Sequence, residues 1–221
     1  AKSRGTEVPG RLVASAKSWL CHTGIDRIAP ILPVDAPEDV QKLSPIVASA
    51  SYLRHLKAAW NHTFAQEGKN RLEEQSIYLT IPASFDAVAR ELTVKAASSA
   101  GLDDTTLLEE PQAAFYAWLH ACRDTWKEEV GPGDLILVCD IGGGTTDFSL
   151  IRVTSEKEKL GLERVAVGDH ILLGGDNMDL ALAYSLSEGL KGKGIMLDHL
   201  QMQTLWYSAR TAKEKLLANQ K

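Results

Sequence analysis

The chain has 221 residues, a formal net charge of −5, 24% charged residues and 44% hydrophobic residues. These values are typical of a soluble globular protein of one large or two small domains, and they exclude a general affinity for nucleic acid or anionic membranes. The three cysteines are far apart and odd in number, which excludes a disulfide framework and favours a reducing compartment. No apolar run reaches about 18 residues and no signal peptide is visible, so we expect a cytoplasmic protein.

The first half of the chain alternates helical and strand patterns. Its helix start and stop signals are clear: proline follows Ser44 where a helix should begin, and Gly101 lies where a helix should end. The expected elements are a helix over 11–20, a proline-rich loop over 25–39, a helix from Ser44-Pro45 to Gly68, a strand over 76–81, a helix over 85–100, a strand over 105–109 and a helix opened by Glu110-Pro111.

The second half begins after Gly131-Pro132-Gly133, within the segment 128–134 that we take as the main boundary. It is expected to contain a strand pair over 135–153, a strand over 162–167, a glycine turn at 174–176, a helix over 178–190, a loop at 192–194 and a helix over 200–217. Strands and helices in this order predict an α/β fold with helices packed on a mixed sheet, built as two lobes joined near 131–134.

The most informative segment is Asp140-Ile-Gly-Gly-Gly-Thr-Thr-Asp147, a tight turn between two strands. Its three glycines would permit positive φ angles and a close approach to a ligand, and their N–H groups can converge on an anion. The two flanking aspartates would suit a Mg²⁺–phosphate complex, because Mg²⁺ prefers oxygen ligands and retained water. The turn thus points to nucleotide binding, although a hairpin tip without any ligand is an equally common use of such glycines.

Four segments, in matching order and spacing, resemble the nucleotide-binding domain of the heat-shock 70 (DnaK-type) chaperones. They are 81–90 (Ile-Pro-Ala-Ser-Phe-Asp-Ala-Val-Ala-Arg), 109–114 (Glu-Glu-Pro-Gln-Ala-Ala), 140–147 and 173–179 (Leu-Gly-Gly-Asp-Asn-Met-Asp). The resemblance covers about residues 11–217 and implies the actin-like (ribonuclease H-like) ATPase fold. It also implies a first lobe over 1–131, divided near residue 43 into peripheral and core parts, and a second lobe over 132–221, divided near residue 175 into a core part and the start of a peripheral adenosine-side part.

The resemblance also assigns roles around ATP or ADP. Gly142, Gly143 and Gly144 would donate N–H groups to the phosphates, with Gly174 and Gly175 on the second lobe's phosphate side. Thr145 would contact the γ-phosphate, Lys17 would neutralise charge there, and Asp140 would orient or deprotonate the attacking water. Asp140, Asp147 and Glu110 would hold Mg²⁺ through water, or an associated monovalent cation such as K⁺, and Lys213 would lie beside the adenine.

Plainer interpretations of these residues stay open. Glu110 could serve only as a carboxylate at a helix N-terminus, and Lys17 could be an ordinary surface lysine. Arg90 helps to couple domains in the family but could be a solvated helix residue here. Glu109, Arg210 and Glu214 depart from the family pattern, which indicates a divergent member and puts the adenosine contacts in question. Trp19, Trp60, Trp126 and Trp206 are unexpected for the family and are interpreted as core or surface anchors.

We therefore expect part of the ATPase domain of a heat-shock-70-like chaperone, incomplete at both ends. The family's first phosphate hairpin would lie about fifty residues before Lys17, beyond Ala1. Unfolded polypeptide and co-chaperones would bind through regions outside this chain, which alone should bind ATP more weakly than micromolar and hydrolyse it slowly or not at all. The alternatives are an actin-like assembly scaffold or pseudo-ATPase and a small-molecule kinase of the same superfamily.

Overall fold

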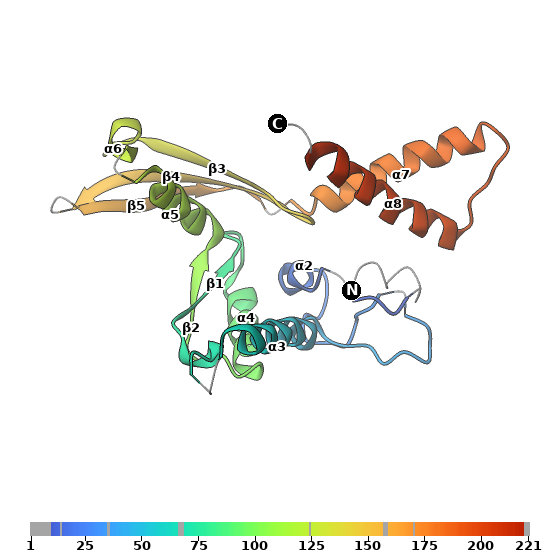
Figure 1. Cartoon of the computed structure of the whole chain (residues 1–221), viewed down its shortest axis with the longest axis horizontal. Coiled ribbons are helices and arrows are strands. Elements are labelled where there is room, and N and C mark those ends of the chain that lie inside the picture. Colours follow the sequence, from blue (N-terminus) through green and yellow to red (C-terminus); the bar gives the residue numbers. More distant parts are fainter. Residues whose placement is uncertain are drawn as a thin grey trace.

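The computed structural model describes residues 10–13, 15–34, 36–65, 69–123, 125–156, 159–169 and 171–218. In chain order the elements are α2 (Ala16–Cys21), α3 (Pro45–Phe64), the 3₁₀ helix η1 (Leu72–Glu74), β1 (Ile77–Ile81), α4 (Ala87–Ser99), β2 (Thr105–Glu109), α5 (Glu110–Cys122), α6 (Trp126–Glu129), β3 (Leu135–Ile141), β4 (Thr146–Glu156), β5 (Lys159–Val167), α7 (Gly175–Lys191) and α8 (His199–Ala218). Figure 1 shows their arrangement. Within the described residues, no helix combines the length and apolar character needed to cross a bilayer.

The predicted helices and strands are confirmed, with differences at their bounds. The first helix begins at Ala16 rather than at residue 11, β5 begins at Lys159 rather than at residue 162, and the short helix α6 ends inside the segment 128–134 that was expected to be a boundary. Gly68, where this helix was expected to end, lies outside the described residues. The helix α3 itself ends at Phe64.

Local hydrogen bonds explain where the two long helices of the first half begin and end. The Ser44 hydroxyl accepts from the Val47 N–H at 3.3 Å, and the Asp86 carboxylate accepts from the Ala89 N–H at 2.7 Å, so both side chains satisfy donors that a helix start leaves unpaired. After α4 the backbone turns at Gly101, whose φ of 72° is a left-handed value that glycine adopts without penalty.

The strands form two separate sheets, so the expectation of a single mixed sheet is wrong. β1 and β2 are parallel, with Ile77 opposite Thr105, because the α4 crossover returns the chain in the same direction. β3, β4 and β5 are antiparallel, because short turns join each strand to the next. No ladder hydrogen bond joins the two sheets in the described part of the chain.

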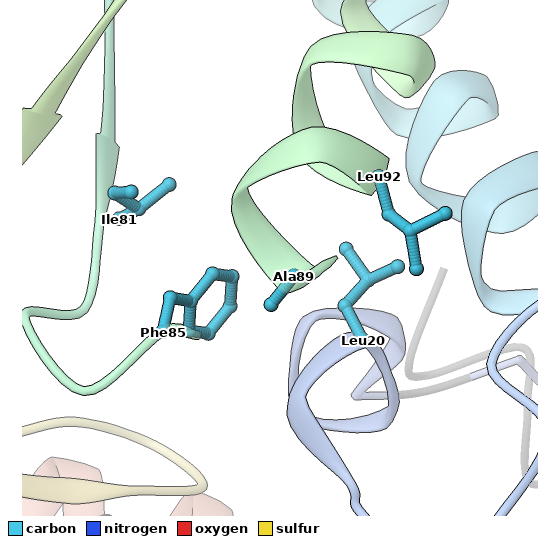
Figure 2. Packing of buried hydrophobic residues seen from close by; sticks show 5 residues of the cluster. All are labelled: Leu20, Ile81, Phe85, Ala89 and Leu92. Carbon is cyan, nitrogen blue, oxygen red and sulfur yellow. The ribbon is translucent and has the colours of Figure 1, made fainter. Parts of the chain in front are cut away.

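A small buried cluster fixes α2 against α4 and the end of β1. Leu20, Ile81, Phe85, Ala89 and Leu92 are each at most 5% exposed and pack together (Figure 2). Removing such side chains from water stabilises a fold by about 1.5–3 kcal/mol for each large residue. Because Leu20 lies one helical turn beyond Lys17, this cluster also sets where the Lys17 side chain begins.

The two sheets are linked by a charge cluster at Glu109, the last residue of β2. Its carboxylate, which is 13% exposed, pairs with Arg90 of α4 at 2.7 Å and with Arg164 of β5 at 2.5 Å. Two guanidinium groups compensate the cost of taking one carboxylate out of water. This pairing gives a physical reason for a glutamate at a position where the family pattern has asparagine.

The chain exposes more surface than a compact protein of its size. The accessible area is 14,423 Å², whereas about 10,000 Å² is expected for a compact 24.1 kDa monomer. Part of the excess is one face of the edge strand β3, where Leu135, Leu137 and Ile141 are 55–61% exposed. The packing within this chain therefore leaves an apolar face of the three-stranded sheet uncovered.

The Glu109 cluster can be tested by substitution. We expect Glu109→Gln to lower the free energy of unfolding by about 1–2 kcal/mol, since both arginines lose a charged partner but Arg164 is partly solvated. Urea unfolding followed by circular dichroism would measure the change. The matched control is Glu91→Gln, which removes an exposed pair with Lys95 on α4 and should leave the midpoint unchanged. Equal midpoints for all three proteins would show that the cluster does not stabilise the fold.

Candidate phosphate-binding site

The turn between β3 and β4 presents a row of unused backbone donors. The Gly142 N–H donates to the Thr145 carbonyl at 2.8 Å, whereas the N–H groups of Gly143, Gly144 and Thr145 have no protein partner among the described residues. None of the three glycines has the positive φ that the sequence suggested. Glycine is favoured here for its lack of a side chain: a Cβ on Gly142 would lie 3.3 Å from the Thr145 carbonyl oxygen.

The turn is anchored on the first residues of α7. The Gly175 and Asp176 N–H groups donate to the Gly142 and Gly143 carbonyls at 3.0 and 2.6 Å. A Cβ on Gly174 would lie 2.6 Å from the Gly142 oxygen, so only glycine permits this approach. In the structure Gly174 and Gly175 thus support the turn, and their predicted contact with phosphate stays a prediction.

Two of the predicted carboxylates lie opposite each other across the hairpin. Asp140 and Asp147 are paired residues of β3 and β4, so their side chains start on the same side of the ladder. Asp147 is only 5% exposed, and the Ser84 hydroxyl of the β1–α4 loop donates to its Oδ1 at 2.7 Å. Ser84 was not a predicted site residue, although it belongs to the 81–90 segment on which the family resemblance depends.

A second group of predicted residues meets beside the turn. Lys17 of α2 forms an ion pair with Glu110 at the start of α5, and Asp140 lies within hydrogen-bonding reach of Glu110. Burial raises the pKa of the Glu110 carboxyl; Lys17 opposes this effect and Asp140 adds to it. Lys17 and Glu110, which are 93 positions apart in the sequence, thus share one small region with Asp140.

The predicted adenine-side residues are engaged within the protein. Lys213 lies 2.6 Å from the buried Asp179 and donates to the Gly175 carbonyl at 2.9 Å. Arg210 pairs with Asp176 at 3.2 Å and with Glu214 at 2.8 Å. These contacts hold α8 against the start of α7.

A cleft of about 390 Å³ opens beside the turn, between α2 and the α7–α8 pair. Gly144 and Ser18 lie on its wall together with Trp19, His22 and Trp206. Sequence reasoning noted both tryptophans as departures from the family but did not place them in a site. The only signal for this placement was that each occurs in a segment assigned to the nucleotide-binding region.

The donor set around the turn suits a hydrated cation better than a directly bound one. No group of three or more His, Cys, Asp or Glu side chains in the described ranges is arranged to hold a metal ion by itself. Glu110, Asp140 and Asp147 nevertheless supply carboxylate oxygens close to the unused amides. Mg²⁺ commonly keeps several waters and combines one or two carboxylates with phosphate oxygens, so these residues fit the predicted cation.

Comparisons with known proteins agree with the motif resemblance. The family model described as "Hsp70 protein" matches residues 29–221. Similar curated proteins include the "Chaperone protein HscA homolog" of Acidithiobacillus ferrooxidans, 33% identical over 221 residues, covering 95% of this chain and 32% of that protein. The protein of the same name from Pseudomonas aeruginosa is 35% identical over 180 residues, covering 81% and 26%. The chain thus spans about a quarter to a third of the length of these relatives.

The contact between Gly174 and the turn gives a first prediction for the site. We expect Gly174→Ala to lower the melting temperature by several degrees, because the added methyl group forces backbone apart. The matched control is Gly189→Ala in the same helix, where a Cβ meets nothing within 4 Å and alanine should stabilise by about 0.5–1 kcal/mol. Differential scanning calorimetry would compare the three proteins. A Gly174→Ala protein as stable as the parent would contradict the close approach.

The raised pKa of Glu110 gives a pH dependence with a defined sign. A carboxyl whose pKa is higher in the folded than in the unfolded chain contributes stability that is complete below its ordinary pKa and is lost as pH rises through the folded pKa. The Glu110→Gln variant cannot ionise at this position. Relative to it, the free energy of unfolding of the parent should therefore fall as the pH rises from the ordinary pKa of glutamate to the raised pKa in the folded chain. Urea unfolding from pH 4 to pH 7 would measure the difference, and Lys17→Gln should shift the window upward. A difference that is constant with pH would exclude the perturbed carboxyl.

Proposed function

Because this chain belongs to the Hsp70 family, we propose that it forms the phosphate-binding part of an ATPase domain of a heat-shock-70-like chaperone. The observation that carries the proposal is the row of three unused N–H groups at 143–145 beside Lys17, Glu110 and Asp140. Consecutive unpaired amides next to a lysine form a site for anionic oxygens, and such donors are most effective when they are held in place before the ligand arrives.

Each residue then has a defined task. The amides at 143–145 hold the phosphate oxygens, and the Thr145 hydroxyl contacts the terminal phosphoryl group. Lys17 neutralises negative charge there, while Asp140 orients the attacking water and accepts its proton. Glu110 and Asp147 position a hydrated Mg²⁺, which supplies charge neutralisation when bound, and an associated K⁺ could occupy the same oxygen-rich region. Gly174 and Gly175 keep the turn in shape, and Lys213 keeps α8 beside it.

The architecture supports a two-lobed, actin-like arrangement. Residues 1–131 would form one lobe, with a peripheral part to about residue 43, and residues 132–221 the other, with a peripheral part from about residue 176. The turn at 142–145 belongs to the second lobe, while Lys17 and Glu110 belong to the first, so nucleotide would bind between them. In a longer cytoplasmic protein, hydrolysis there would control binding of unfolded polypeptide and be adjusted by co-chaperones.

The proposal predicts that ATP affinity depends on Lys17. Isothermal titration of the 221-residue chain with Mg·ATP at millimolar concentration should detect binding. Lys17→Ala should weaken it about tenfold or more, because a charge-assisted contact with phosphate contributes about 1.5–3 kcal/mol. Lys95→Ala, which removes an exposed lysine of α4, is the matched control and should bind as the parent does. Equal affinities for the parent and Lys17→Ala would refute the assignment of Lys17.

A further inference from the structure

The cleft beside the phosphate turn is lined by two chemically different kinds of group. Gly144 belongs to the row of unused amides, and the Ser18 hydroxyl lies 3.8 Å from where a Cβ on Gly144 would be. The rings of Trp19 and His22 are stacked, with centroids 5.4 Å apart, and Trp206 of α8 also lines the cavity. A ligand that uses the whole cleft would therefore combine an anionic group with a flat aromatic group.

The position of Trp206 is fixed by its surroundings. Its indole N–H donates to the Asp176 carbonyl at 3.2 Å, and its ring stacks on Tyr207 with centroids 5.5 Å apart. Trp206 and Leu180 also line a second cavity of about 580 Å³. Cavities of this size, with aromatic walls and a few polar groups, are typical of small-molecule sites.

The residues that the family pattern would place beside the adenine are poorly available in this chain. Drawing Lys213 toward a base would separate it from Asp179, which is 1% exposed, and leave that carboxylate buried without its charged partner. Arg210 is held by two carboxylates. Trp206 lies seven residues before Lys213, on about the same face of α8 and about 10 Å further along its axis.

We propose that the purine base of the nucleotide stacks on Trp206 in the cleft that faces Trp19, and not against Arg210 and Lys213. The inference rests on the proposed function, since the phosphates must bind at 143–145 for the base to reach this cleft. It departs from the family arrangement in a region where the sequence also departs from the family, at Arg210 and Glu214. Asp176, Asn177 and Ser15 also line this cavity, so polar residues lie beside its aromatic ones.

The test compares Mg·ATP with inorganic tripolyphosphate, which carries the phosphates but has no base. Both are titrated calorimetrically into the whole chain and into three variants. Trp206→Leu removes the stacking surface, Trp206→Phe retains an aromatic ring, and Trp60→Leu removes a tryptophan of α3 that does not line this cleft. Thermal unfolding of each variant identifies any loss of folding.

We expect Trp206→Leu to weaken Mg·ATP about tenfold and to leave tripolyphosphate unchanged, because base stacking on an aromatic side chain is a sequence-tolerant source of affinity. Trp206→Phe should stay within about threefold of the parent and Trp60→Leu should match it. If Trp206→Leu is folded and binds ATP like the parent, the base lies elsewhere while the phosphate site stands. If neither ATP nor tripolyphosphate binds the parent chain, the proposed function fails and this inference fails with it.

Discussion

The contact between the β3–β4 turn and the first residues of α7 is the constraint on which the site depends. The carbonyls of Gly142 and Gly143 accept the first amides of α7, so the turn uses its acceptors on the helix and keeps three donors unpaired. The same contact places the turn at the N-terminal end of a 17-residue helix, where the aligned peptide dipoles favour negative charge. One packing arrangement thus creates the donors and gives them a favourable field, and Gly174 is required because no side chain fits between.

The charges around the turn explain why a cation and an anion would bind together. Lys17 is the positive partner of Glu110, and Asp140 and Asp147 add two more carboxylates to the same region. Burial raises the pKa of Glu110, and the neighbouring Asp140 adds to that effect. A divalent cation would relieve that repulsion, and its phosphate partner would in turn satisfy the unused amides. A cation alone would neutralise the carboxylates but leave the amide donors unpaired, and an anion alone would do the reverse.

Much of the local structure followed from the sequence because its signals act over a few residues. Ser44-Pro45 and Gly101 marked helix ends through capping and backbone preference, and these positions are confirmed. The two separate sheets could not be predicted in the same way. Periodicity identifies a strand but not its partner, and here the strands pair within two independent units.

At the site, too, local sequence patterns predict some features, whereas others depend on contacts between residues far apart in the chain. Lys17, Glu110 and Asp140 lie together in the structure, and the reason to group them beforehand came from the family resemblance and not from spacing. The glycines of the turn were expected to need positive φ, whereas none of them has it, and only Gly142 is in a place where a side chain would be crowded. The place of Trp206 depends on how α8 packs against α7, and on which residues of α2 line the same cavity, which no local pattern specifies. Tertiary packing decides such positions, so a departure from a family pattern is informative only once its surroundings are known.

The distribution of the site over the fold has an energetic consequence. Its groups come from α2, from the start of α5, from the β3–β4 turn and from α7, so ligand bound there would join parts that otherwise share few buried side chains. The large exposed surface and the uncovered face of β3 indicate that packing within this chain is modest. A ligand that binds the assembled site and not its separated parts stabilises the assembly by RT ln(1 + [L]/Kd), which is about 2.7 kcal/mol at a hundredfold excess over Kd. Because that amount is at least as large as the contribution expected from the Glu109 cluster, occupancy of the site would add to the interactions that hold the two sheets together.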